Sequence, residues 1–336
     1  MRSVFSSICA GLLVLGAAQA STLEDVKKRD KLLCGVNAGL QGFAQKDEAG
    51  VWAGFDVDYC KAVAAATLGD AAKVEFVAAT VADRFDKLAK GEIDILARNT
   101  TWTMERETKW PLRFVGVSYH DGQGFLMKTL MGVTSVFNMS SAAICVVKGT
   151  TNQANVDDFF RERDMAYTAL SFDTSDEAIK AYDEGKCDAY TADQSQLYAV
   201  RQRVAKPDDH IILPEVISKE PLGPVVRADD AQWFNIARWT LFALVNAEEL
   251  ELRAANIDDE TANSKKPGVR RLLGAEGTFG TDLGLDNAWA ARAIKAVGSY
   301  GEIFDRNLGA GSKLGIERGL NALWSNNGIL YAPPVR

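Results

Sequence analysis

The pattern of apolar and polar positions predicts strands and helices that alternate along the first third of the chain. Five segments carry the pattern: residues 31–36, 57–68, 73–78, 83–90 and 93–97. The first, third and fifth are short apolar or alternating runs typical of strands, and the other two repeat apolar residues at helical spacing. Gly69 and Gly91 end the two helices. This order predicts a parallel sheet flanked by helices.

A second unit of the same kind follows. Its segments are a strand at 142–147, a helix at 152–163 and a helix opened by the capping-box sequence Thr174-Ser175-Asp176-Glu177. The junction at 185–188, between this helix and the next strand, echoes the junction at 91–94 in the first unit. The echo fits two similar lobes, although helix–glycine–strand junctions are common enough to match by chance.

Glycine- and proline-rich segments at 122–124 and 221–224 predict two crossings between the lobes. The expected division is residues 21–123 for the first part of lobe 1, residues 124–220 for lobe 2, and residues 221–336 for the return to lobe 1 with a C-terminal extension. A strongly apolar helix at 229–246 is assigned to lobe 1. The predicted fold class is α/β, with two lobes, each a mostly parallel sheet flanked by helices, joined by two hinge crossovers.

Residues 1–20 have the order of a secretory signal peptide. Arg2 precedes an apolar run at 4–15, and small residues precede the expected cleavage before Ser21. The run is too short to cross a hydrocarbon core of roughly 30 Å as a helix. Cys9 raises the alternative of a lipoprotein signal, but it lies inside the apolar run and follows a large residue. We therefore predict export to the periplasm without direct membrane insertion.

Four cysteines remain beyond the predicted signal, an even number in a chain bound for an oxidising compartment. They are Cys34, Cys60, Cys145 and Cys187. Three pairings are possible, and four buried thiols are the alternative. We favour one disulfide between Cys34 and Cys60 and another between Cys145 and Cys187, because each pair then falls within one predicted lobe.

The charge balance excludes several classes of partner. The chain has 38 Lys and Arg against 45 Asp and Glu, a formal net charge of −7. Such acidity argues against nucleic acids and anionic membranes as partners. No cysteine spacing resembles a zinc or haem motif, and His120 and His210 belong to no recognisable triad. We therefore predict no metal and no cofactor.

Several motifs resemble the family 3 extracellular solute-binding proteins, which are receptors of polar amino-acid importers. They are Gly54-Phe55-Asp56-Val57-Asp58, Thr101-Trp102-Thr103-Met104-Glu105-Arg106 and Gly149-Thr150-Thr151. Three further stretches, at 98–103, 119–125 and 217–224, resemble the general L-amino-acid-binding branch. The motifs are weak individually and strong jointly, since their order and spacing fit over nearly the whole chain after residue 20.

This resemblance implies the charged contacts of a site for a free amino acid. Arg106 matches the family's carboxylate-binding arginine, whose planar guanidinium can bind both oxygens at once. Thr151 matches the residue whose amide and hydroxyl meet the same carboxylate at a helix N-terminus. Asp193 matches the ammonium partner, completed by Thr101 and by the backbone carbonyl of Asn99. The alternatives are a surface arginine and, for Thr151 and Asp193, ordinary helix caps.

The residues expected around the ligand side chain differ from those of narrow-specificity relatives. Leu40 and Val81 stand where such relatives often have aromatic residues, which implies a roomier pocket and broad specificity. Phe43 remains as an apolar wall, more in keeping with the core than with a ligand contact. Arg84 aligns with an arginine of acidic-amino-acid receptors, and a solvated helix arginine is the alternative.

The resemblance implies a monomeric Venus-flytrap receptor that closes on an L-amino acid and docks on an ABC permease with its ATPase, without catalysis. One rival is a periplasmic enzyme on the same fold, similar to cyclohexadienyl dehydratases. Another is the ligand module of a signalling receptor. Residues 251–285 exceed what short family members carry, and residues 319–336 are apolar enough to pack on a lobe.

Overall fold

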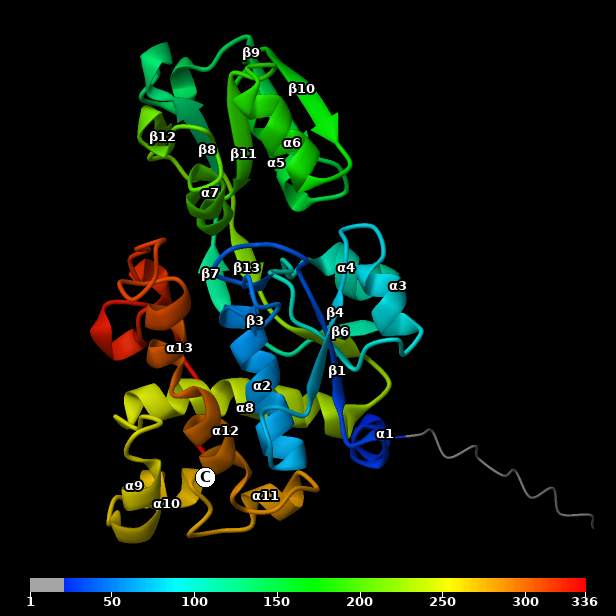
Figure 1. The fold of residues 1–336 in the computed structure, drawn as a ribbon, viewed down its shortest axis with the longest axis vertical. Coiled ribbons are helices and arrows are strands. Elements are labelled where there is room, and N and C mark those ends of the chain that lie inside the picture. The colour runs from blue at the N-terminus through cyan, green and yellow to red at the C-terminus, as the bar shows by residue number, and fades with distance from the viewer. Residues whose placement is uncertain (1–20) are drawn as a thin grey trace, which may run out of the picture.

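The computed structural model describes residues 21–336, which form two lobes joined by a pair of hinge strands (Figure 1). The predicted signal peptide at 1–20, including Cys9, lies outside the described residues. Within residues 21–336, no helix is both long enough and apolar enough to cross a membrane. Each lobe is built on its own five-stranded sheet, so each has its own core.

The sheet of lobe 1 has the strand order β4-β1-β5-β14-β6. Its strands are β1 (Leu32–Val36), β4 (Val74–Ala78), β5 (Ile95–Leu96), β6 (Leu112–Phe114) and β14 (Val225–Arg227). β1 runs parallel to β4 and β5, as the alternating pattern predicts. β14 runs antiparallel between β5 and β6, because the chain enters it on its way back from lobe 2. A two-stranded hairpin, β2 (Gln45–Lys46) and β3 (Trp52–Ala53), stands beside this sheet.

Helices surround the sheet of lobe 1 and extend beyond its end that faces away from lobe 2 (Figure 1). They are α1 (Thr22–Arg29), α2 (Phe55–Leu68), α3 (Arg84–Ala89), α4 (Met104–Lys109), α8 (Ala231–Glu249), α12 (Trp289–Val297) and α13 (Tyr300–Asn307). α2 is buried along almost its whole length, because it packs between the sheet and α8, α12 and α13. Asp58 on this buried helix accepts hydrogen bonds from Arg306 and Asn307 at 2.7–2.9 Å, which satisfies its charge inside the core.

The sheet of lobe 2 has the order β10-β9-β11-β8-β12. Its strands are β8 (Gln123–Lys128), β9 (Ala142–Val147), β10 (Tyr167–Phe172), β11 (Ala189–Asp193) and β12 (His210–Ile212), and its helices are α5 (Thr151–Arg161), α6 (Ser175–Asp183) and α7 (Gln194–Arg201). Lobe 2 also contains three short 3-10 helices, η1 (Thr129–Met131), η2 (Val136–Asn138) and η3 (Pro207–Asp209). Thr174 and Glu177 form the capping box expected at the start of α6.

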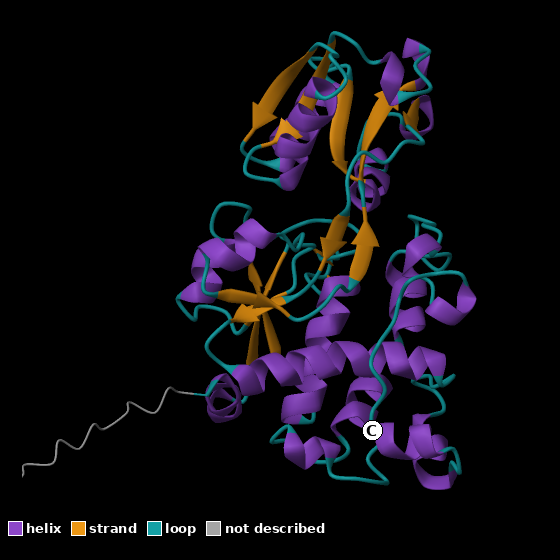
Figure 2. Cartoon of the chain, turned by 180° about the vertical axis from the view of Figure 1, so that it is seen from behind, coloured by secondary structure: helices purple, strands orange, loops and turns teal. Residues whose placement is uncertain are grey.

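The two lobes are connected by β7 (Tyr119–Asp121) and β13 (Glu220–Leu222), which pair antiparallel. β7 leads into β8 of lobe 2, and β13 leads back toward β14 of lobe 1. Figure 2 shows these two strands from behind, running between the sheets. Such a narrow connection lets two rigid bodies rotate, because only a few backbone dihedrals need to change.

One disulfide lies in each lobe, and the four cysteines pair as predicted from the sequence. Cys34 on β1 is bonded to Cys60 on α2, with Cα atoms 6.3 Å apart. Cys145 on β9 is bonded to Cys187, with Cα atoms 5.6 Å apart. All four residues are buried, so each bridge ties a sheet to an adjoining segment of its own lobe.

The C-terminal part adds an extra helical layer to lobe 1. The expected insertion at 251–285 contains α9 (Ile257–Asn263), α10 (Pro267–Leu272) and α11 (Phe279–Asp282). The last segment contains the 3-10 turns η4 (Gly319–Asn321) and η5 (Trp324–Asn326), and its Leu323, Leu330 and Ala332 join the core of lobe 1. The tail also reaches the hinge, where the side chain of Asn321 makes two hydrogen bonds with the backbone of His120.

Candidate functional site

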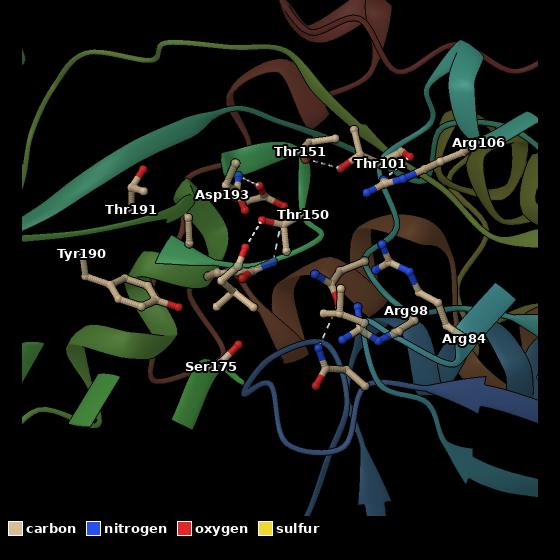
Figure 3. A pocket seen from close by; sticks show the side chains of 17 residues that line it. Arg84, Arg98, Thr101, Arg106, Thr150, Thr151, Ser175, Tyr190, Thr191 and Asp193 are labelled. Atoms are coloured by element: carbon tan, nitrogen blue, oxygen red, sulfur yellow. Dashed lines mark hydrogen bonds between the residues drawn. The ribbon is translucent and has the colours of Figure 1, made fainter. Parts of the chain in front are cut away.

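A polar cavity lies where the two lobes face each other, next to the hinge (Figure 3). Lobe 1 lines it with the loops after β1, β4 and β5 and with α4. Lobe 2 lines it with the start of α5 and the end of β11. Its lining residues are Asn37, Val81, Arg84, Arg98, Asn99, Thr101, Arg106, Val147, Thr150, Thr151, Asn152, Ser175, Tyr190, Thr191, Ala192, Asp193 and Gln196.

Arg106 projects into this cavity from α4. The hydroxyl of Thr103 caps this helix by accepting the backbone N–H of Arg106, and Arg106 Nη1 donates to the carbonyl oxygen of Thr101 at 2.5 Å. Its guanidinium also lies over the ring of Phe85, 5.8 Å from the centroid. Burial lowers the pKa of Arg106, and the nearby carboxylates of Glu220 and Asp193 oppose this shift. The side chain is partly exposed and is held in place by the carbonyl of Thr101 and the ring of Phe85.

Asp193 faces the cavity from the end of β11, on the opposite lobe. It is the N-cap residue of α7, but its side chain makes no capping hydrogen bond. Its Oδ1 instead accepts from Asn152 Nδ2 at 2.8 Å. Burial raises the pKa of Asp193 well above its usual range, and the carboxylates of Asp121 and Glu220 raise it further. A cation bound in the cavity would stabilise the ionised form of Asp193.

Thr151 is the first residue of α5, and Thr150 is the N-cap. The hydroxyl of Thr150 donates to the carbonyl oxygen of Val147 and makes no capping bond. The first N–H groups of this helix are therefore available to an anion at the cavity. Across the gap, Thr101 Oγ1 lies 3.4 Å from Thr151 Oγ1, which is a polar contact between the two lobes at the site (Figure 3).

Asn99 holds the loop after β5 in an unusual conformation. Its φ is +35°, and its backbone N–H donates to the buried carboxylate of Asp56 at 2.8 Å. Its side-chain oxygen accepts from Asn37 Nδ2 at 3.1 Å. The side chain of Asn99 is thus used within the protein, which leaves the backbone carbonyl as the group that a ligand could contact.

Three arginines of lobe 1 converge on the cavity, Arg84, Arg98 and Arg106 (Figure 3). Arg84 is buried over the ring of Phe85, and its Nε has no hydrogen-bond partner among the described residues. Burial lowers the pKa of Arg84 well below its usual range, and the charges of Arg98 and Arg106 lower it further. Arg98 donates from Nε to the carbonyl oxygen of Ala79, and burial lowers its pKa to about 10 against the charge of Asp56.

A second cavity of about 250 Å³ adjoins the first and shares part of its lining, including Val81, Arg98 and Tyr190. Leu40 lies on its wall, so Leu40 and Val81 stand together as the sequence suggested. Phe43 lines neither cavity. It is buried in the core of lobe 1, with its ring edge-on to Phe55 and Tyr119, because the loop after β1 folds inward there.

Several lining residues are not predicted by the sequence motifs. Arg98 belongs to one motif, and its position directly after an apolar strand is a signal that could have identified it as a site residue. Asn37, Tyr190 and Gln196 carry no such signal, because their position depends on how the lobes meet. Among residues 21–336, no group of His, Cys, Asp or Glu is arranged to hold a metal ion.

The chain is similar to known proteins over almost its whole length. The sequence model of the bacterial extracellular solute-binding proteins, family 3, matches residues 32–254. The chain is 53% identical to the general L-amino acid-binding periplasmic protein AapJ of Rhizobium johnstonii, over 98% of each chain. It is 50% identical to the glutamate/glutamine/aspartate/asparagine-binding protein BztA of Rhodobacter capsulatus, over 99% of this chain and 98% of that one.

Among solved structures, the chain is similar to an ABC transporter periplasmic binding protein from Brucella ovis with glutathione bound. The TM-score is 0.93 and the identity 52%, and the match covers 95% of this chain and 100% of that one. The similarity therefore extends over both lobes and the C-terminal helices, beyond the residues that the family's sequence model matches.

Proposed function

We propose that this chain, which belongs to the bacterial extracellular solute-binding proteins of family 3, is the periplasmic receptor of an ABC importer for L-amino acids with broad specificity. One observation carries the proposal: a half-buried guanidinium, Arg106, and a buried carboxylate, Asp193, line one cavity from opposite lobes. The two charges complement the carboxylate and the ammonium group of a free amino acid.

Each end of the ligand meets several groups. Arg106 and the first N–H groups of α5 bind the α-carboxylate, which a helix N-terminus also attracts through its dipole. Asp193, the hydroxyl of Thr101 and the backbone carbonyl of Asn99 supply three acceptors for the three donors of the ammonium. Both ends draw on side chains that are already fixed by packing or hydrogen bonds, so little entropy is lost on binding.

The positive wall of the cavity favours ligands with an acidic side chain. Arg106 is matched by the ligand carboxylate and Arg98 by Asp56, whereas Arg84 keeps a buried Nε without a partner. A side-chain carboxylate of glutamate or aspartate would pair with Arg84. The aliphatic walls at Leu40 and Val81 tolerate other side chains, which is consistent with broad specificity.

Ligand contacts from both lobes give the closed state its advantage. A ligand shifts an equilibrium only by its differential affinity for the two states. Rotation about β7 and β13 would change the distance between Arg106 and Asp193, so an amino acid bound to both favours closure. The closed monomer then docks on a membrane permease whose ATPase supplies the energy. Export by the signal peptide at 1–20 places the receptor in the periplasm.

A second candidate ligand class is the γ-glutamyl peptides. The neighbour from Brucella ovis is a structure with glutathione bound, and glutathione carries the free α-amino acid end of glutamate. The adjoining cavity of about 250 Å³ lies beside the proposed amino-acid site and could receive the rest of such a peptide. Its wall includes Arg203, which pairs with Asp176 of the same wall at 2.6 Å, so a terminal carboxylate of the peptide would compete with this ion pair.

The site gives no support to catalysis. Neither His120 nor His210 lines the two cavities, and the buried carboxylates there already have hydrogen-bond donors. A signalling module would use the same ligand site with a different partner protein. The family to which the chain belongs therefore supports the importer function over the signalling function.

A thermal-shift series tests the proposal. The purified protein is heated with each of the twenty L-amino acids, with glutathione and with prephenate. A ligand at a hundredfold over its Kd should stabilise the protein by about 2.7 kcal/mol. Shifts with several L-amino acids, acidic ones included, support the receptor. No shift with any amino acid, or consumption of prephenate, would refute it.

A further inference from the structure

The hinge strand β13 begins with a buried carboxylate, Glu220, that reaches the rim of the site. It is 1% exposed and forms no ion pair among residues 21–336. Its Oε2 accepts hydrogen bonds from Thr101 Oγ1 at 2.6 Å and from Thr151 Oγ1 at 2.8 Å. Its Oε1 accepts from Asn155 Nδ2 at 2.6 Å and from Ser218 Oγ at 2.8 Å. One side chain of the hinge therefore contacts a ligand-site threonine of each lobe.

These contacts decide which way the two hydroxyl protons point. A threonine hydroxyl has one proton to donate and two lone pairs to accept with. The two hydroxyls lie 3.4 Å from each other, farther than either lies from Glu220. A Glu220 oxygen is the nearest acceptor for both hydroxyls, and shorter hydrogen bonds are the stronger ones, so both protons point to Glu220. Each hydroxyl then offers only lone pairs to the cavity.

We propose that Glu220 is a positioning residue that makes the site specific for a protonated α-amino group, by turning the hydroxyls of Thr101 and Thr151 into acceptors. This inference rests on the proposed function. It assigns the Thr151 hydroxyl to the ammonium end of the ligand, in place of the carboxylate end that the family resemblance implied. The α-carboxylate keeps Arg106 and the backbone N–H groups of α5.

The network around Glu220 explains why this orientation is fixed. Asn155 Nδ2, which donates to Glu220, also donates to Gln123 Oε1 at 3.0 Å. Gln123 Nε2 in turn donates to Thr191 Oγ1 at 2.8 Å, on the strand that ends at Asp193. The Nδ2 of Asn155 and both ends of the Gln123 amide have partners, so rotating either side chain would cost buried groups such as Glu220 and Thr191 a hydrogen bond.

The test compares L-glutamate with L-2-hydroxyglutarate, which replaces the ammonium by a hydroxyl and keeps both carboxylates. Their dissociation constants are measured by calorimetry, or by competition for weak binding, in the wild type, in Glu220→Gln and in the control Glu215→Gln. Glu215 lies five residues earlier and accepts a backbone N–H in lobe 2, away from the cavities. An amide cannot accept all four hydrogen bonds, so Glu220→Gln frees hydroxyl protons toward the ligand.

We expect Glu220→Gln to raise the Kd of L-glutamate at least about tenfold and that of L-2-hydroxyglutarate by less than about twofold, so that the ratio of the second Kd to the first falls at least about fivefold. Glu215→Gln should leave the ratio unchanged. A merely structural role would weaken both ligands equally, and an unchanged ratio in Glu220→Gln therefore overturns the inference. If no L-amino acid binds the wild type, the proposed function fails instead, which is a separate outcome.

A second variant keeps the test decisive if Glu220→Gln does not fold. Thr151→Val removes the hydroxyl and keeps the shape of the side chain. If this hydroxyl accepts from the ammonium, the variant weakens L-glutamate more than L-2-hydroxyglutarate. If it donates to the carboxylate, which both ligands share, the two weaken by the same factor and the inference is wrong.

Discussion

The two walls of the cavity differ in charge and in how their side chains are held. The lobe 1 wall carries three arginines, supported by the ring of Phe85 and by backbone carbonyls. The lobe 2 wall carries one carboxylate, Asp193, within a network of side-chain hydrogen bonds around Asn152. A zwitterion spans two such walls, and neither wall alone offers both charges. The division of charge between lobes is thus what couples ligand binding to closure.

Removing the main cation of the lobe 1 wall should break this complementarity most severely. We expect Arg106→Ala to weaken the binding of every L-amino acid by about 2–5 kcal/mol, because truncating one partner of a buried charge pair costs that much. Thermal-shift assays should then show no stabilisation by any amino acid. Lys109→Ala is the control, since Lys109 lies on the same helix but pairs with Glu105 at the surface. Intact shifts in Arg106→Ala would contradict the assignment.

The disulfides compare the two lobes as folded bodies. Replacing both cysteines of either bridge by alanine should lower the free energy of unfolding by about 2–4 kcal/mol. The bridge in lobe 2 spans 42 residues and that in lobe 1 spans 26, so the chain-entropy account predicts the larger loss in lobe 2. Urea unfolding measures both. A larger loss in lobe 1 would show that packing around Cys60 outweighs chain entropy.

Arg84 tests whether the excess positive charge of lobe 1 selects acidic side chains. Arg84→Leu should weaken L-glutamate and L-aspartate about ten- to hundredfold, or about 1.4–2.7 kcal/mol. Neutral amino acids should bind within a few-fold of their wild-type affinity. Calorimetric titration measures both groups, and Arg113→Leu, a cation outside the two cavities, is the matched control. Equal losses for acidic and neutral ligands would assign Arg84 to the fold alone.

The buried acid beneath the lobe 1 wall, Asp56, should make the stability of the protein depend on pH. Burial raises the pKa of Asp56 to about 7, while in the unfolded chain it ionises near 4. Between these values the native state holds a proton that the unfolded chain has lost. Stability should therefore decrease as pH rises from about 4 to 7, by at most about 1.4 kcal/mol per pH unit.

Urea unfolding of the wild type and of Asp56→Asn across this pH range isolates the contribution. The variant keeps an oxygen that can accept the N–H of Asn99, and it should lose this part of the slope. Parallel pH profiles for the two proteins would show that Asp56 does not titrate in this window.

The alternation of strands and helices could be predicted because local periodicity sets it, as the segments at 31–36 and 57–68 show. Arg106 and Asp193 could be anticipated because they match the ligand-binding arginine and carboxylate of the family that the sequence resembles. The antiparallel insertion of β14 could not, since its short apolar run of Val225 and Val226 says nothing of direction.

The site residues that the sequence alone does not identify have a common physical reason: their partners are distant in sequence. Glu220 follows a turn-rich segment, and nothing local marks its contacts with threonines 69 and 119 residues away in sequence. The position of Arg98 directly after an apolar strand is a local signal, but its place beside Arg84 and Arg106 depends on the tertiary fold. Phe43 could be expected as core or wall, and only the inward fold of its loop decides for the core.

The central claim is that opposite lobes bind the two charged ends of one amino acid. It is tested most directly by titrating the wild-type protein with L-glutamate, with glutarate, which lacks the ammonium, and with 4-aminobutyrate, which lacks the α-carboxylate. We expect each analogue to bind at least about a hundredfold more weakly than L-glutamate, a difference in binding free energy of about 2.7 kcal/mol. Binding of either analogue within a few-fold of L-glutamate would contradict it.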